Sequence, residues 1–118
     1  KSKIQYSYIR NSGKIYPHTD GTNKLLSLML YFPDGLKNEE KIGTIFWKSK
    51  IRNFKNKHRE TDDELKKFYS NSKKICITPF EENTLYGFIK NSDSWHSVEK
   101  INVNENYIRK SININFFI

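Results

Sequence analysis

Residues 107–118 read YIRKSININFFI, the longest regular pattern in the chain. The side chains fall into two alternating sets, Ile108, Lys110, Ile112, Ile114 and Phe116 against Arg109, Ser111, Asn113 and Asn115. Successive residues of a β-strand point to opposite faces of its sheet, so this period of two predicts a strand.

Seven further runs of strand-forming residues precede it, and most end at turn signals such as Asn11-Ser12-Gly13 or Pro33-Asp34-Gly35. The eight predicted strands span residues 4–9, 15–20, 25–32, 43–47, 75–78, 85–89, 95–101 and 107–118. The run 25–32, LLSLMLYF, is almost continuously apolar, which favours burial on both faces. Many short strands in one small chain predict a mainly all-β fold, that is, a sandwich, a barrel or a jelly roll.

One charged stretch, residues 48–74, interrupts the rhythm of the strands. Within it the sequence TDDE at 61–64 has the form of a capping box, and apolar residues follow at helical spacing. We therefore expect one short helix over 62–69, inside a basic insertion that is either a substrate lid or a solvated loop. His58 lies in this insertion without a partner at ligand spacing, so we expect it to be solvated.

The composition suits one domain with a compact core, because the chain has 118 residues and an aromatic content of 14%. No apolar run approaches the roughly 20 residues that a membrane helix needs, so we expect no membrane partner. The single cysteine, Cys76, excludes an internal disulfide framework and a cysteine-based zinc cluster. We expect its thiol to be buried as a small apolar group, and the protein to be cytoplasmic.

The formal net charge of +8 raises the question of nucleic-acid binding. The same charge arises on any solvated surface that is rich in lysine. Lysine, asparagine and isoleucine dominate the sequence, and A/T-rich codons encode all three, so base composition accounts for part of the excess. Nucleic acid is therefore not the partner that we expect.

Two polar residues at the end of the second predicted strand have the spacing of a metal site. His18 and Asp20 are two residues apart, so both can point to one side of a strand and reach one ion. A second histidine, His96, lies at the start of the seventh predicted strand, and Arg109 and Ser111 lie in the last. Two histidines and one carboxylate suit non-haem Fe(II) and leave coordination positions open for oxygen chemistry.

Five segments carry a family resemblance: YPHTD at 16–20, LMLYF at 28–32, GTIFW at 43–47, WHSV at 95–98 and RKS at 109–111. In this order they resemble the successive motifs of the Fe(II)/2-oxoglutarate-dependent oxygenases, and most nearly those of the prolyl-4-hydroxylase-like branch. The resemblance runs from about residue 4 to residue 117. It implies a double-stranded β-helix, or jelly roll, in which residues 1–118 form a single oxygenase domain that lacks the family's N-terminal flanking helices.

The resemblance also implies roles for the matching residues. The iron ligands would be His18, Asp20 and His96. The residues that bind the cosubstrate 2-oxoglutarate would be Arg109, Ser111 and Tyr31. A guanidinium suits this role because it offers a planar fork to a carboxylate. With O₂ as the oxidant, the presence of Asp20 favours hydroxylation, because relatives that halogenate lack this carboxylate.

The substrate is less well defined. Asn23 and Lys24 follow the turn beside the expected iron and are candidate substrate contacts, whereas Trp47 is either a substrate platform or a core residue. A prolyl or other side chain of a protein, a nucleobase and a small metabolite all fit. The rival functions are a jelly-roll module that binds carbohydrate or nucleic acid without catalysis, an inactive oxygenase fold, and a cupin-type metalloenzyme.

Overall fold

The computed structural model describes residues 1–52 and 58–118, and it is built mainly from antiparallel strands. In chain order its elements are β1 (Ser2–Arg10), β2 (Ile15–His18), β3 (Lys24–Tyr31), the 3-10 helix η1 (Glu39–Lys41), β4 (Ile45–Ser49), α1 (Asp62–Ser70), β5 (Ser72–Ile77), β6 (Leu85–Ile89), β7 (Trp95–Val98) and β8 (Ile108–Phe117). Each predicted strand is present, with its ends moved by a few residues.

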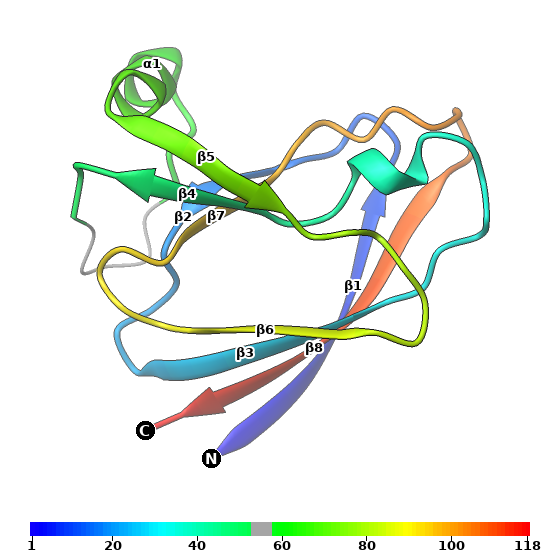
Figure 1. Ribbon diagram of the computed structural model, residues 1–118, viewed down its shortest axis with the longest axis horizontal. Coiled ribbons are helices and arrows are strands. Elements are labelled where there is room, and N and C mark those ends of the chain that lie inside the picture. Colours follow the sequence, from blue (N-terminus) through cyan, green and yellow to red (C-terminus); the bar gives the residue numbers. More distant parts are fainter. Residues whose placement is uncertain (53–57) are drawn as a thin grey trace.

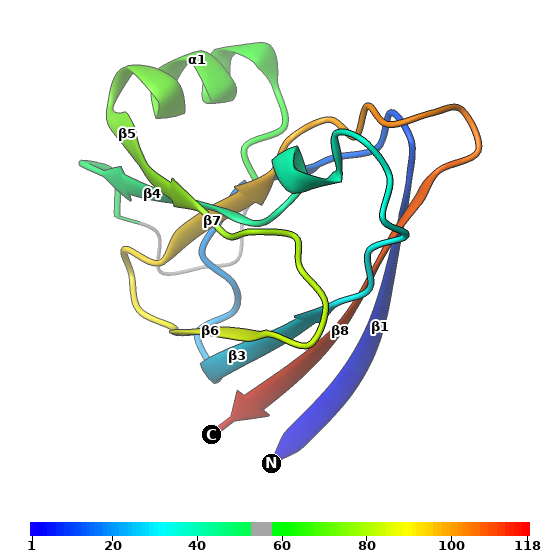
Figure 2. The same ribbon diagram turned by 45° about the vertical axis from the view of Figure 1, so that its right-hand side comes forward.

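The strands form two four-stranded sheets that face each other (Figure 1). One sheet has the order β1-β8-β3-β6 and the other has the order β2-β7-β4-β5. The chain passes between the sheets at most of its connections, which winds it into a double-stranded β-helix. The predicted jelly roll is therefore confirmed. The two chain ends lie side by side, because Ser2 pairs with Phe116 (Figure 2).

Strands β1 and β8 of the first sheet turn mostly polar side chains toward the interior and apolar side chains outward. On β8, Arg109, Ser111 and Asn115 are buried, whereas Ile108 and Phe116 are exposed. The other exposed apolar residues of this sheet include Ile4, Tyr6, Tyr8, Leu25, Leu85 and Ile89. The inner face therefore lines a polar cavity, and among the described residues no element covers the outer face.

This arrangement corrects the prediction that residues 25–32 are buried on both faces. Ser27, Met29 and Tyr31 are buried on the inner face of β3, but Leu25 and Phe32 are 47% and 45% exposed. An apolar run predicts burial on both faces only where layers cover both sides of the sheet. Here the second sheet covers one side, and the part of the chain that the structure describes supplies no layer for the other.

Apolar packing is concentrated in two places. The main core, between the sheets, consists of Met29, Tyr31, Ile42, Phe80, Val98, Ile101 and Tyr107. Outside the second sheet, Phe68 of α1 is fully buried against the rings of Trp47 and Trp95. The predicted helix is thus confirmed, and so is its capping box, in which Thr61 Oγ1 accepts a hydrogen bond from the backbone N–H of Glu64.

The predicted insertion is shorter than residues 48–74. Lys48 pairs with Lys73 and Ser49 pairs with Ser72, so the hairpin of β4 and β5 continues into this stretch from both ends. Residues 53–57 of the predicted insertion lie outside the described residues. Cys76 is exposed rather than buried, because β5 is the edge strand of its sheet and most of its residues are exposed. No helix in the described part of the chain has the length and apolar character needed to cross a membrane.

We expect Phe68→Ala to destabilise the protein by about 3–5 kcal/mol, the usual cost of removing a fully buried aromatic side chain. The lost ring is the contact through which α1 packs on Trp47 and Trp95. Urea unfolding followed by tryptophan fluorescence measures the change. Tyr69→Ala is the matched control, since Tyr69 is 49% exposed on the same helix, and it should cost much less. Equal losses in the two variants would contradict the packing described above.

Candidate metal centre

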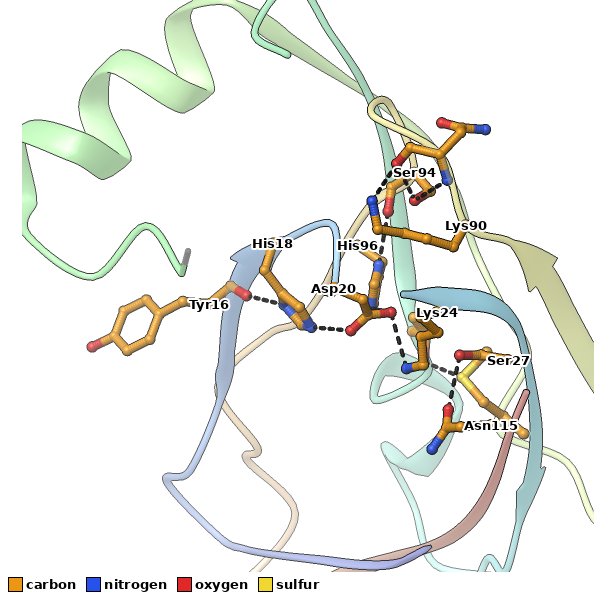
Figure 3. A network of polar contacts seen from close by, with 12 residues as sticks. Tyr16, His18, Asp20, Lys24, Ser27, Lys90, Ser94, His96 and Asn115 are labelled. Atoms are coloured by element: carbon orange, nitrogen blue, oxygen red, sulfur yellow. Dashed lines mark hydrogen bonds and ion pairs between the residues drawn. The ribbon is translucent and has the colours of Figure 1, made fainter. Parts of the chain in front are cut away.

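His18, Asp20 and His96 converge at one edge of the second sheet (Figure 3). His18 ends β2 and His96 lies in β7, where the two residues are direct partners in the antiparallel pair. Asp20 follows β2 in a turn and has a φ of 70°, a left-handed conformation that is uncommon for a residue with a side chain. One potential ligand atom from each of the three residues lies within 4.8 Å of the others.

The backbone sets the orientation of both imidazoles. His18 Nδ1 lies 2.8 Å from the carbonyl of Tyr16, and His96 Nδ1 lies 2.8 Å from the carbonyl of Ser94. A carbonyl oxygen only accepts hydrogen bonds, so each Nδ1 carries a hydrogen and, in a neutral ring, each Nε2 keeps its lone pair. Metal-binding histidines are commonly held in this way.

The two Nε2 atoms point at the carboxylate of Asp20. His18 Nε2 lies 3.2 Å from Oδ1, and His96 Nε2 lies 3.5 Å from Oδ2. Lone pairs on two ring nitrogens and a carboxylate at such distances repel one another unless a proton or a metal cation lies among them. The donor set, two nitrogens and one carboxylate, is the one that suits divalent iron and related metals. The residues therefore fit a bound divalent cation.

The electrostatics keep His96 and Asp20 in the protonation states that bind metal. Burial and the nearby His18 lower the pKa of His96 to about 4, so its imidazole is neutral at neutral pH. Burial raises the pKa of Asp20, but its contacts with His18, His96 and the ammonium of Lys24 more than offset this and lower it overall. Neutral imidazoles and an ionised carboxylate are the forms that coordinate cations.

The lowered pKa of His96 predicts how the stability of the metal-free protein depends on pH. A histidine in the unfolded chain titrates near 6.5 and His96 near 4, so between these values the unfolded chain binds more protons. Stability is then fully present above pH 6.5 and is lost as the pH falls towards 4, by about 3 kcal/mol. Urea unfolding at a series of pH values measures this loss. His96→Gln should flatten the curve in this range, and an unchanged curve would contradict the assignment to His96.

His58 also lies at this site, which corrects the prediction of a solvated residue. Its ring stacks on that of His18 with centroids 4.0 Å apart and planes 10° from parallel, and it lines the same cavity. The backbone N–H of Arg59 donates to the carbonyl of Pro17, which attaches this segment to β2. All three histidines of the chain therefore meet at one place.

We expect His58→Ala to weaken the binding of Co(II), a spectroscopic substitute for Fe(II), by about tenfold or less, the low end of the range for groups that support metal ligands. The ring of His18 would lose its stacking partner and gain water on that face. Isothermal titration of the metal-free protein measures the effect. His58→Phe keeps a flat ring and should retain most of the affinity. A complete loss of Co(II) binding in His58→Phe would instead indicate that His58 is itself a metal ligand.

A buried guanidinium lines the same cavity, whose volume is about 480 Å³. Arg109 is 2% exposed, its Nε–H donates to the carbonyl of Ile42 at 2.7 Å, and its guanidinium lies over the rings of Tyr31 and Phe80. Among the described residues no carboxylate forms an ion pair with it. Burial lowers the pKa of Arg109, yet an arginine keeps its charge in proteins. A buried charge without a counter-ion is costly, so this one is suited to an anionic ligand.

Hydroxyl groups surround this end of the cavity. Tyr31 Oη donates to Thr44 Oγ1 at 2.8 Å and lies 2.8 Å from Thr78 Oγ1. Ser111 is buried on β8, two residues from Arg109, and lines the cavity with Tyr31 and Thr44. The structure thus brings Arg109, Tyr31 and Ser111 together on one cavity. It adds Thr44, which sequence reasoning missed although the predicted strand 43–47 contains it.

The candidate substrate residues divide into two groups. Asn23 and Lys24 line the cavity, and Lys24 forms an ion pair with Asp20. Trp47 does not line it. Its Nε1–H donates to Ser97 Oγ, and its ring packs on Phe68 and Tyr69. Trp47 belongs to the packing under α1, and the structure does not support it as a substrate platform.

The chain matches no family model, and no curated protein matches it in sequence. Its structure is similar to a crystal structure of a prolyl-4-hydroxylase from Pseudomonas putida, with a TM-score of 0.57 and 13% sequence identity. The alignment covers 99% of this chain and 51% of that chain, so this chain spans about half the length of its structural neighbour. At this identity the similarity shows the fold alone, and it agrees with the jelly roll described above.

Proposed function

We propose that this chain is an Fe(II)- and 2-oxoglutarate-dependent dioxygenase domain that hydroxylates an unactivated C–H bond. The observation that carries the proposal is the pairing of two features in one cavity: three converging metal donors, and the buried guanidinium of Arg109, which has no carboxylate partner among the described residues. A binding module without chemistry has no use for both. The jelly-roll fold and the structural similarity to a prolyl-4-hydroxylase support the same assignment.

His18, Asp20 and His96 would hold the iron through their Nε2 and carboxylate oxygen atoms. When bound, Fe(II) activates O₂ with 2-oxoglutarate as the electron donor, so that one oxygen atom enters succinate, the other enters the substrate, and CO₂ leaves. Because the carbonyls of Tyr16 and Ser94 hold both rings, the donors are already oriented before the metal arrives. Phe88 packs on His96, with ring centroids 4.5 Å apart, and helps to exclude water from the site.

Arg109 would bind the distal carboxylate of 2-oxoglutarate, with hydroxyl groups of Tyr31, Thr44 and Ser111 beside it. The guanidinium provides a charge-assisted and geometrically specific contact. Because the rings of Tyr31 and Phe80 flank it, the guanidinium is already positioned before the anion binds. The cosubstrate would therefore be fixed at the buried end of the cavity, and its reactive end would face the metal donors.

Anaerobic titration tests the proposal directly. Fe(II) and 2-oxoglutarate together should give a weak visible charge-transfer band, and neither should give it alone. Admission of O₂ should then produce succinate, which a substrate would accelerate. A prolyl or other amino-acid side chain in a peptide is the first substrate class to screen, because the structural neighbour is a prolyl-4-hydroxylase. Absence of the band with correctly folded protein would favour the non-catalytic binding module instead.

A further inference from the structure

Lys24 forms an ion pair with Asp20 at the candidate metal centre. Lys24 Nζ lies 3.1 Å from Asp20 Oδ2, and the side chains of the two residues are only 14% and 11% exposed (Figure 3). Surface ion pairs contribute little to stability, but this one is largely shielded from water and involves a candidate metal ligand. It therefore acts directly on the chemistry of the carboxylate.

The local backbone is arranged to make this contact. Asp20 adopts its left-handed φ of 70° at the end of β2, and the chain then turns so that the N–H of Lys24 donates to the carbonyl of Gly21. This turn brings the first residue of β3 back over the carboxylate that precedes the turn. A left-handed residue with a side chain is strained, and such strain is concentrated at functional sites.

The contact makes the two oxygens of Asp20 unequal. Oδ2 lies beside the ammonium of Lys24, whereas Oδ1 lies beside His18 Nε2 with no lysine within ion-pair distance among the described residues. A carboxylate can bind a cation through one oxygen or through both. With Oδ2 engaged by an ammonium, Asp20 has one oxygen free for a metal.

The geometry points to Lys24 as a positioning residue that restricts Asp20 to coordination through one oxygen and so keeps a metal position open for the cosubstrate. This inference rests on the proposed function. Lys24 is then part of the metal centre rather than a substrate contact. Its positive charge also opposes binding of a divalent cation beside it and favours binding of a dianion, because like charges repel and opposite charges attract at short range.

The inference has a signature that a purely structural ion pair does not share. In Lys24→Met, both oxygens of Asp20 are free and one positive charge is gone. Co(II) should therefore bind the metal-free protein with unchanged or up to about tenfold higher affinity. The affinity of the Co(II) form for 2-oxoglutarate should fall by about tenfold or more, because charge is lost and a metal position is taken. Lys24→Arg should restore both values towards those of the wild type.

Anaerobic isothermal titrations with Co(II) chloride and then 2-oxoglutarate measure both affinities. Lys110→Met is the matched control, since Lys110 forms a similar pair with Asp34 at 2.9 Å on the sheet surface, and it should change neither affinity. If Lys24→Met does not fold, Lys24→Gln takes its place. Affinities for metal and cosubstrate that fall together, or that both stay unchanged, would overturn the inference about Lys24. A wild-type protein that binds no Co(II) would instead contradict the proposed function itself.

Discussion

His96→Ala should abolish the charge-transfer band with Fe(II) and 2-oxoglutarate, and succinate formation with it. The variant removes one of only three donors, and His96 Nε2 has no replacement among the described residues except the stacked ring of His58. Metal affinity should fall by more than the roughly 10–100-fold loss that is usual when a group that supports a metal ligand is removed. Isothermal titration of the metal-free protein with Co(II) measures it independently of turnover.

Two comparisons make this result specific. His58→Ala should lower the metal affinity only slightly. Comparison of the two variants therefore distinguishes a metal ligand, His96, from a supporting residue, His58. The metal-free His96→Ala protein should also stay folded at neutral pH, because it loses a buried polar ring and leaves only the carbonyl of Ser94 without its donor. If His96→Ala retained the band, the triad could not be the metal site.

The sequence predicted the strands of this protein better than it predicted their faces. On β8 the period of two was evident, but the usual expectation of apolar residues inside would have turned Ile108 and Phe116 inward. The structure buries Arg109, Ser111 and Asn115 instead, because they line an interior cavity whose walls are largely polar. Periodicity defines two faces, and only the position of a second layer or a ligand decides which one is inside.

The same ambiguity applies to β4, where the sequence alone left Trp47 as either a substrate platform or a core residue. The alternation in GTIFW groups Thr44 with Phe46 and separates both from Trp47. Thr44 lines the cavity and Phe46 packs near His96, so Trp47 necessarily faces the helix on the other side. Once one residue of a strand is known to face the site, its neighbours follow from the spacing.

His58 could not have been placed by local spacing at all. Its contact with His18 spans forty residues of sequence and depends on Arg59 pairing with Pro17 at the edge of β2. The candidate metal ligands were easier to find, because His18 and Asp20 are close in sequence and His96 lies in a recognisable strand. A residue that reaches a site from an insertion lies outside the alternating pattern of a strand, so sequence spacing does not indicate its position.

Arg109→Met is expected to separate cosubstrate binding from metal binding more sharply than any other change. The affinity for 2-oxoglutarate should fall by about 30-fold to 4,000-fold, which corresponds to the about 2–5 kcal/mol lost when one partner of a buried charge pair is removed. The affinity for Co(II) should stay within a few-fold of the wild type, because Arg109 is not among the three metal donors. Paired titrations, first with metal and then with cosubstrate, measure both values.

Stability decides whether Arg109 serves a ligand or the fold. In the metal-free protein its charge is buried and pairs with no carboxylate of residues 1–52 or 58–118, and such a charge costs several kcal/mol. In Arg109→Met the carbonyl of Ile42 loses its hydrogen-bond donor, which destabilises the protein by about 1–3 kcal/mol. The substitution also removes the buried charge, whose cost is larger. The variant should therefore unfold at the same or a higher urea concentration than the wild type. Arg109→Lys, which keeps the charge but not the planar fork, should bind 2-oxoglutarate with intermediate affinity. A large loss of stability in Arg109→Met would show that the guanidinium supports the fold, and the strongest observation for an anionic cosubstrate would be lost.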